Sequence, residues 1–501
     1  MRPASLPLRF RNSERPPCRE PDGEGMWEVV SLGIRDELGP LSRTFVNGEV
    51  SFWHRQAGMP AARPALPGDR QYDVAVVGAG YTGLWTAYYL KKDQPDLRIA
   101  VLESEFAGFG ASGRNGGWLS AEPPGQLRRY AAAEGWPAAR NLQRHMFAAV
   151  DEVIGICAAE GIDADIDKAG VIHAATNPAQ EKRLRDHVRA QRAAGWGQDD
   201  LVELDRAELA ERIRIEGALA AQWSPHCARI QPAKLAIGLA AAVEALGVDI
   251  FEGTRVTQIL AGRAVTDHGT VSADHVIRAT EGFTAGLKGQ RRVWLPMNSS
   301  MVVTEPIPEH LWARIGWDGG EVVGDAAHSF CYMQKTADGR IVIGGRGIPY
   351  RFGSRTDNRG VTHPTTHHQL RDILERYFPA ARDLALDHAW SGVLGVPRDW
   401  CASVHLDRAT GLGWAGGYVG HGVAGTNLAG RTLRDLVLGR DTELTRLPWV
   451  GHRVRGWEPE PLRWIGVRSL YVAYRAADRR EFAGSRRTAA IARVADRISG
   501  R

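Results

Sequence analysis

The 501-residue sequence is poor in cysteine and lysine, and it contains no long apolar run. Its five cysteines lie far apart and form no CxxC pair, so neither a disulfide framework nor a cysteine-based zinc site is predicted. No stretch of about 18 uncharged apolar residues occurs, so no transmembrane helix is predicted. The N-terminal segment carries arginines but lacks the apolar core of a secretory signal. We therefore expect a reducing, cytoplasmic setting.

The basic residues are almost all arginine, and they are unevenly distributed. The formal net charge is +5, but residues 475–501 alone hold eight arginines against three acidic residues. Residues 1–25 hold five arginines against four acidic residues, which leaves the rest of the chain close to neutral. A nearly neutral body with one basic tail is not typical of a nucleic-acid-binding protein, so no nucleic acid partner is expected.

Composition and length indicate a folded chain with more than one structural unit. Hydrophobic residues make up 44% of the sequence, which excludes a wholly disordered protein. Residues 1–45 start with a segment rich in Pro, Arg and Glu, and we expect them to form a disordered or poorly ordered extension. Met26 is an alternative to Met1 as the first residue. Residues 446–501 are predicted to form a C-terminal extension that ends in a basic amphipathic helix.

A glycine pattern at residues 78–83 stands between a predicted strand and a predicted helix. Tyr72–Val77 and Leu97–Leu102 have the composition of buried strands and Leu84–Lys92 that of a helix, which together predict a βαβ unit. In this setting GxGxxG is typical of dinucleotide binding, because the glycines allow a tight turn, close approach to a pyrophosphate and close helix–strand packing. The predicted cofactor contacts are Gly78, Ala79, Gly80, Tyr81, Thr82 and Gly83.

An acidic residue stands where a dinucleotide site needs one. Glu103 follows the second strand, 20 residues after Gly83. A carboxylate there accepts hydrogen bonds from ribose hydroxyls and repels a 2′-phosphate, so FAD or NAD is favoured over NADP. Ser104, beside it, is also a predicted cofactor contact. The alternative is a glycine turn in an unrelated α/β fold.

Residues 106–117 form a glycine-rich run, FAGFGASGRNGG. A run with so few Cβ atoms allows the backbone to lie flat against a large ligand, whereas a simple NAD-binding domain would return quickly to a helix. The segment resembles the flavin-contacting loop of the D-amino-acid-oxidase-like superfamily of FAD-dependent oxidoreductases. The resemblance implies FAD contacts at Gly110, Ala111, Ser112, Arg114, Asn115, Gly116 and Gly117.

Further segments resemble the same superfamily, in order, along residues 46–470. The resemblance implies an α/β fold in which a Rossmann-like FAD-binding domain of the glutathione-reductase type is interleaved with an α+β substrate domain on a mostly antiparallel sheet. The FAD-binding domain is expected from residues 70–130, 225–290 and 390–445, and the substrate domain from 131–224 and 291–389. Further cofactor contacts are implied at Val256, Ala279, Thr280, Gly420, His421, Gly422 and Val423.

Several stretches are similar to the amine-oxidising group that includes gamma-glutamylputrescine oxidoreductases. They are residues 48–53, 110–120, 230–235, 338–347, 397–400 and 457–468. This similarity implies a noncovalent FAD enzyme, and residues 386–392 hold no cysteine of the kind to which sarcosine-oxidase relatives attach flavin. Glycine-oxidase relatives carry an arginine just after that strand to hold the substrate carboxylate. Here the first arginine is Arg398, so an amine without an α-carboxylate is favoured, although Arg398 could still reach the site.

The resemblance implies a specific reaction. A primary or secondary amine, gamma-glutamylputrescine-like, would be oxidised to an imine by hydride transfer to flavin N5, and water would hydrolyse the imine. Oxygen or another electron acceptor would complete the cycle. Two alternatives stay open, namely an amino-acid oxidase or dehydrogenase of the same superfamily and a non-catalytic flavin-binding protein.

Four residues are candidates for the catalytic site, each with a plainer alternative. His421, beside the predicted start of the last FAD-domain helix, could orient flavin or adjust substrate protonation, or it could be an ordinary loop histidine. Tyr332 and Arg346 flank the hairpin that roofs the substrate cavity in the family, but either could belong to the sheet surface. Trp390 could line the pocket or belong to the core.

Several other features carry weaker hypotheses. Trp294 is a second pocket candidate, and Lys335 could aid oxygen activation or be a solvated residue of a hairpin. Residues 363–368, HPTTHH, are expected to form a loop rather than a metal site, because Pro364 interrupts any helix that would join the histidines.

The tail 487–498 has an apolar helical face opposite arginines. We expect this face to dock onto the protein body, so membrane association is not favoured. The face consists of Ile491, Val494, Ala495 and Ile498.

Overall fold

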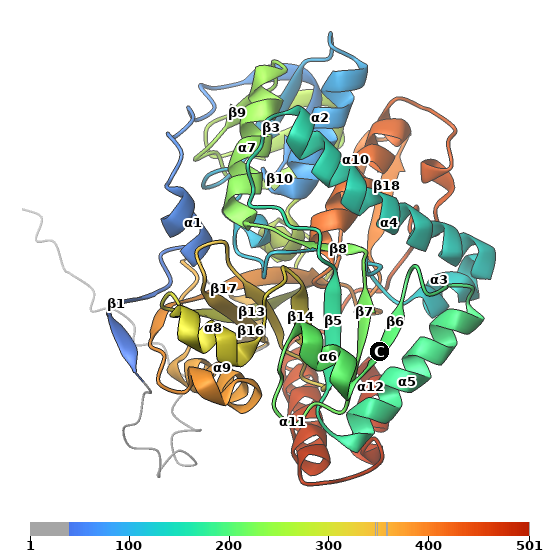
Figure 1. The fold of residues 1–501 in the computed structure, drawn as a ribbon. Helices are drawn as coiled ribbons and strands as arrows, with labels where there is room; N and C mark the ends of the chain where they lie inside the picture. The colour runs from blue at the N-terminus through green and yellow to red at the C-terminus, as the bar shows by residue number, and fades with distance from the viewer. Residues whose placement is uncertain (1–39, 346, 348, 357–358, 500–501) are drawn as a thin grey trace, which may run out of the picture. The chain divides into compact units, whose positions relative to one another are not determined.

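The computed structural model describes residues 40–499 except 346, 348, 357 and 358. Two large β-sheets with helices packed around them carry the fold (Figure 1). The predicted α/β class, with a second sheet that is mostly antiparallel, is confirmed. Cys18, Met26 and most of the predicted N-terminal extension lie outside the described residues.

The first sheet is built around the predicted βαβ unit. Its four neighbouring strands β12, β2, β3 and β9 run parallel, and β19 adds a further parallel strand beside β12. In order, the strands are β10 (Val256–Leu260), β11 (Arg263–Thr266), β12 (Thr270–Arg278), β2 (Arg70–Val77), β3 (Ile99–Leu102) and β9 (Asp249–Phe251), with β19 (Leu412–Gly416) and β18 (Ser403–Asp407) beside β12.

Apolar helices form the core with this sheet. Helix α2, Tyr81–Asp93, is buried from Tyr81 to Leu90, which explains why its sequence is apolar all round. Gly430 allows close helix packing, because a Cβ there would lie 2.7 Å from the Cβ of Trp85. The helices of this layer are α2, α4 (Trp136–Ala159), α7 (Pro232–Ala245) and α10 (Gly422–Val437).

Strand β13 is the third strand from one edge of the second sheet. All ten residues of this strand are buried, and it pairs antiparallel with β17 and β16. Among the described strand pairs of this sheet, only β1–β17 and β14–β5 are parallel. In order, the strands are β1 (Leu41–Asn47), β17 (Leu386–Val396), β13 (Leu295–Thr304), β16 (Ile341–Gly345), β15 (Tyr332–Lys335), β14 (Val322–Asp325), β5 (Val171–Ala175), β7 (Ala220–Ser224) and β6 (Val202–Asp205).

Smaller elements complete the described chain. Strands β4 (Trp118–Ser120) and β8 (Cys227–Arg229) form a separate antiparallel pair. Among the described helices, none is both long and apolar enough to cross a membrane. The remaining helices are α1 (Phe52–Ala57), α3 (Leu127–Glu134), α5 (Pro178–Ala193), α6 (Arg206–Arg212), α8 (Glu309–Ile315), α9 (Pro364–Tyr377), α11 (Leu462–Phe482) and α12 (Ala490–Ser499).

Three predicted boundaries differ from the structure. Residues 41–45, assigned to the disordered extension, belong to strand β1, because Leu41 and Phe45 pack against the core of the second sheet. Strand β17 pairs with β13 through residue 396, so a domain boundary at 390 would cut the second sheet. Helix α4, assigned to the substrate domain, contributes its apolar face to the core of the first sheet.

Buried carboxylates fasten α11 to the loop after β14. Glu481, with a fully buried side chain, accepts hydrogen bonds from Arg183 at 2.8 and 2.9 Å and pairs with His328 at 3.0 Å. Asp478 accepts the backbone N–H groups of His328 and Ser329. Burial opposes ionisation of Glu481, but its bonds to His328 and Arg183 outweigh burial and hold its pKa at about 2.

Replacing Glu481 with Ala should destabilise the protein by about 3 kcal/mol, because it removes the buried carboxylate that pairs with both Arg183 and His328. Folding depresses the pKa of Glu481. In the parent protein its carboxylate therefore stabilises the fold fully above the ordinary pKa of 4.5, and this stabilisation fades as the pH falls towards 2. Chemical denaturation near neutral pH measures the effect. Glu443→Ala is the control, since that side chain is 75% exposed and its removal should cost under about 1 kcal/mol. Equal losses in both variants would contradict the anchoring role.

Candidate active site

The glycine turn brings strand β2 and the start of α2 close together. Gly78 has φ +106°, and a Cβ there would lie 2.7 Å from the Ala279 carbonyl oxygen. A Cβ at Gly83 would lie 2.0 Å from the Gly78 carbonyl oxygen, so only glycine allows strand and helix to approach this closely. The N-cap Gly80 provides no side-chain cap, but the Ser112 hydroxyl accepts the N–H of the first helical residue at 2.8 Å. The other backbone N–H groups at this helix start suit a pyrophosphate.

Glu103 lies beside this turn, as the sequence predicts. Its carboxylate accepts the Ala79 N–H at 2.8 Å and the Glu105 N–H at 3.1 Å, and burial raises its pKa. Ser104 donates its hydroxyl to the same carboxylate at 3.3 Å. Thr254, two residues before Val256, donates its N–H to the Glu103 carbonyl.

Ala279 and Thr280 follow strand β12, which lies next to β2. The Ala279 N–H bonds to the Val77 carbonyl, directly before the glycine turn, and the Thr280 hydroxyl contacts the Thr284 hydroxyl at 2.8 Å. The predicted contacts of the adenosine half therefore gather at one end of the first sheet. This arrangement fits a dinucleotide.

The glycine-rich run is held in a fixed shape. The Arg114 side chain is 1% exposed, donates to the Phe109 carbonyl at 2.7 Å and stacks on the Phe109 ring. Asn115 donates to the Ser112 carbonyl and accepts the Gly117 N–H. At Gly116 a Cβ would lie 2.6 Å from the Tyr332 ring. The run is therefore fixed by hydrogen bonds within itself and by close packing against Tyr332.

A cavity of about 680 Å³ borders this run. Its volume suits a flavin ring together with a small substrate, and its walls are mainly apolar, with Met301, Leu394 and Val419 among them. Eight residues predicted from the sequence lie on its wall: Ala111, Arg114, Asn115, Gly116, Tyr332, Gly420, His421 and Val423. The GxGxxG residues lie outside this wall, at the dinucleotide turn.

A carboxylate in this cavity was not predicted from the sequence. Glu122 Oε2 lies 3.2 Å from His421 Nδ1, and Glu122 Oε1 lies 3.4 Å from His173 Nε2. Burial opposes ionisation of Glu122, but His421 and His173 outweigh it and hold its pKa below the usual range. His187 also lines the cavity, and burial together with His173 lowers its pKa. The group joins a loop, a strand and a helix far apart in sequence.

The arginines of the cavity wall point to protein acceptors. Arg183 lines the cavity, yet its guanidinium is bound to Glu481 and to the Ala326 carbonyl at 2.7 Å. Arg114 donates to the carbonyls of Phe109 and Ser391. Within the described part of the wall, the cavity thus offers a carboxylate more readily than a guanidinium.

Some predicted candidates lie elsewhere. Trp390 is fully buried against Phe52 and Trp53 and donates its indole N–H to the Arg114 carbonyl, so it supports the glycine-rich run and does not line the cavity. Its assignment as a catalytic residue is therefore corrected. Arg346 lies outside the described residues.

The weaker candidates also lie away from the cavity wall. Trp294 is buried under Arg278, and Lys335 donates to the Trp317 carbonyl at 2.9 Å. Arg398 pairs with Glu458 at 3.1 Å and does not reach the cavity. The HPTTHH segment is not the expected loop, because His363 caps helix α9 and the helix continues through His367.

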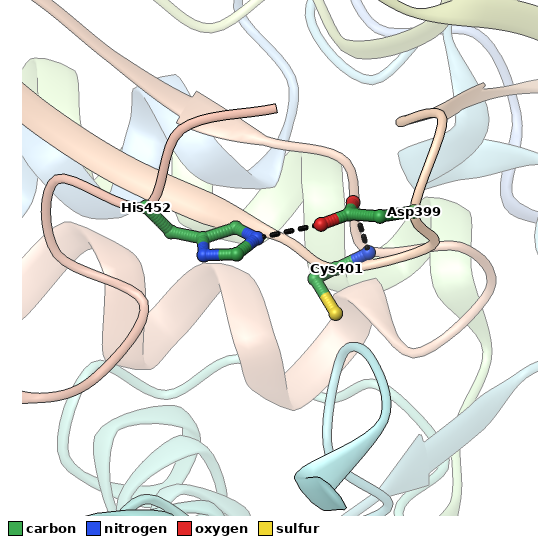
Figure 2. A group of neighbouring side chains, drawn as sticks. All are labelled: Asp399, Cys401 and His452. Carbon is green, nitrogen blue, oxygen red and sulfur yellow. Dashed lines mark hydrogen bonds and ion pairs between the residues drawn. The ribbon is translucent and has the colours of Figure 1, made fainter. Parts of the chain in front are cut away.

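A second cluster joins the turn after β17 to the loop before α11. Figure 2 shows Asp399 between the backbone of Cys401 and the ring of His452, at 3.1 and 2.7 Å. The Asp399–His452 separation is shorter than the roughly 3.3 Å expected between two ligands of tetrahedral zinc. We interpret the contact as a hydrogen-bonded tie between two loops.

The dinucleotide turn, its acidic partner and the adjoining cavity define a flavin-type oxidoreductase. The family model described as FAD dependent oxidoreductase (DAO) matches residues 73–436. The chain belongs to this family and is an FAD-dependent enzyme.

Curated relatives and solved structures agree with this assignment. A probable oxidoreductase OrdL of Rhizobium meliloti is 31% identical over 77% of this chain and 87% of its own. The gamma-glutamylputrescine oxidoreductase of Escherichia coli is 31% identical over 73% of this chain and 84% of its own. Glycine oxidase from Geobacillus kaustophilus has a TM-score of 0.63 at 24% identity, covering 77% of this chain and 100% of its own.

The Gly83→Ala variant should lose bound FAD, because the added methyl forces α2 away from the glycine turn. Flavin absorbance relative to protein absorbance measures the occupancy. Gly155→Ala is the matched control, since a Cβ at that exposed helix position meets nothing within 4 Å. Full flavin content in Gly83→Ala would contradict the assigned role of this turn.

Glu281 links the end of β12 to the loop before His421. Its carboxylate accepts the N–H groups of Gly417 and Tyr418 at 2.9 and 3.3 Å. Burial raises its pKa from 4.5 to about 7, against these bonds and the charge of Arg278. The loop that contributes to the cavity wall is therefore held by a carboxyl group that titrates near neutral pH.

Glu281→Gln should reduce the dependence of stability on pH between about 4.5 and 7. Because folding raises the pKa of Glu281, its stabilising contribution is complete below pH 4.5 and is lost as pH rises through 7. Unfolding midpoints of both proteins across this range measure the difference. Parallel profiles would contradict a raised pKa.

Proposed function

We propose that this enzyme oxidises the C–N bond of a primary or secondary amine to an imine, which water hydrolyses. The observation that carries the proposal is the position of Glu122, an anionic carboxylate on the cavity wall within 3.4 Å of two histidines. An ammonium group is the natural partner of a carboxylate in a mainly apolar cavity. A gamma-glutamylputrescine-like amine is the form of substrate that we favour.

The distribution of arginines supports an amine over an α-amino acid. A carboxylate beside the oxidised C–N bond needs a cationic partner. Among the described residues, Arg114 and Arg183 are bound to protein acceptors and Arg398 lies outside the cavity. Glu122 would repel a carboxylate placed beside it. The 31% identical Escherichia coli relative, named for an amine substrate, is consistent with this choice.

Four residues of the cavity wall would take part in the proposed reaction. Bound FAD would supply the two-electron oxidation, and noncovalent binding is favoured because β17 contains no cysteine. Glu122 would bind the substrate ammonium, and the neutral form of His421, 3.2 Å away, would accept the ammonium proton so that the amine becomes neutral. Met301 and Val419 would exclude water from the reacting carbon.

One alternative substrate class keeps support. A glycine oxidase of Geobacillus kaustophilus is 26% identical over 76% of this chain, which is consistent with amino-acid oxidation. The non-catalytic alternative is not retained, because the family consists of FAD-dependent oxidoreductases.

Anaerobic flavin reduction by amines and amino acids distinguishes these functions. We expect gamma-glutamylputrescine or related amines to bleach the flavin, and glycine, sarcosine and proline to do so far more slowly. In Glu122→Gln, the amine concentration for half-maximal reduction should rise at least about tenfold, because the charge-assisted bond is lost. The pKa of Glu122 is depressed, so the effect should persist throughout the neutral range.

Glu443→Gln provides the control, since its carboxylate is 75% exposed and lies outside the cavity wall. Reduction by amino acids alone would refute the amine proposal. An FAD-loaded protein that neither amines nor amino acids reduce would also contradict the amine proposal.

A further inference from the structure

The large exposed hydrophobic side chains concentrate on two helices. Seven of the eleven such side chains in the described chain lie on α11 and α12. Figure 1 shows these two helices in red. They are Leu462, Ile465, Val472, Phe482, Ile491, Val494 and Ile498, with exposed fractions from 36% to 67%. A concentration of this kind indicates a binding surface rather than scattered apolar residues.

Helix α12 does not dock as the sequence predicts. Its small residues Ala492 and Ala495, 0% and 2% exposed, face inward, whereas Val494 and Ile498 are each 58% exposed. Tyr474 of α11 donates to Asp496 at 2.9 Å, which fixes this rotation of α12. The larger apolar side chains therefore remain on the outside of a firmly packed helix.

The exposed charges on the same two helices are positive. The acidic side chains of this segment are turned inward or held by hydrogen bonds: Asp478 and Glu481 are buried, and Asp496 accepts from Tyr474. The exposed charges include Arg479, Arg480, Arg493 and Arg497 on the helices, and Arg486 and Arg487 lie in the loop that joins them. The surface is therefore apolar and cationic together. We call these exposed residues of α11 and α12 the C-terminal face.

An apolar groove is part of this face. A space of about 230 Å³ lies between α11, the end of α12 and the loops that carry Trp400 and Trp457. Leu462 and Ile498 are exposed at its rim. The groove could receive aliphatic chains, and the arginines could contact the charged groups to which those chains are attached.

We propose that the C-terminal face binds the surface of an anionic lipid bilayer. Ile491, Val494 and Ile498 enter the interface between headgroups and acyl chains, while the arginines contact lipid phosphates. A second copy of the chain suits the face poorly, because two such faces would place arginines of one sign opposite one another. Nucleic acid suits it poorly because large aliphatic side chains alternate with the arginines.

Flotation of the FAD-loaded protein with lipid vesicles tests the proposal. We expect binding to phosphatidylcholine vesicles that contain phosphatidylglycerol, weaker binding at high salt, and little binding to pure phosphatidylcholine. Failure to bind the anionic vesicles would overturn the proposal, and so would equal binding to both. Neither result depends on the substrate, so the outcome is independent of the proposed amine oxidation.

Two variants assign the binding to this face. Ile491→Asn/Val494→Asn/Ile498→Asn and Arg493→Glu/Arg497→Glu should each lower vesicle partitioning at least about tenfold, because one removes apolar insertion and the other reverses charge. Flavin content should be unchanged, because all five side chains are exposed.

Matched controls lie on other surfaces. Met59→Asn changes a side chain that is 58% exposed, and Arg263→Glu/Arg314→Glu reverses two exposed charges elsewhere. Both should bind vesicles like the parent protein. Equal binding by the test and control variants would refute the proposal, as would a dimer in sedimentation that the triple asparagine variant dissociates. Comparable binding to duplex DNA would also refute it.

Discussion

The close packing of residues 106–117 is the constraint on which the site depends. A Cβ at Gly113 would lie 2.2 Å from the His54 ring, and one at Gly117 would lie 2.0 Å from Gln334 Nε2. Side chains at these positions would push the run away from α1 on one side and from the second sheet on the other. Because both positions are glycine, the run can pack against α1 and the second sheet at once. The dinucleotide turn of one sheet and the cavity wall of the other can then serve one cofactor.

Charge placement in the cavity follows from the same packing. Arg114 belongs to the run, but its guanidinium is drawn into the interior by the carbonyls of Phe109 and Ser391. The Arg183 guanidinium pairs with the buried carboxylate of Glu481 on helix α11. Glu122, which follows the run after strand β4, is left facing two histidines. Among the described wall residues, the arginines thus serve the fold, whereas Glu122 contacts histidines of the cavity wall.

The sequence predicts the cofactor site far better than the substrate site, and the reason is physical. The turn at Gly78–Gly83 and Glu103 are features of short range, with spacing fixed by one βαβ unit. Glu122 and His173 come from segments beside β4 and in β5, which belong to different sheets. They meet only through the tertiary fold, which no local sequence pattern indicates. Trp390 was assigned wrongly because eight successive residues of β17 are buried, so alternation cannot tell the cavity face from the core face.

The local sequence pattern also does not predict which face of α12 turns inward, for a different reason. Rotating the helix to bury its isoleucines would gain about 1.5–3 kcal/mol for each side chain buried. The contact with α11 is lined by Ala477, Ala489 and Ala492, and it leaves no room for larger residues. Rotation would also break the Tyr474–Asp496 hydrogen bond. Close packing of small residues therefore fixes which face of α12 turns inward, and the amphipathic pattern of the sequence describes the face that turns outward.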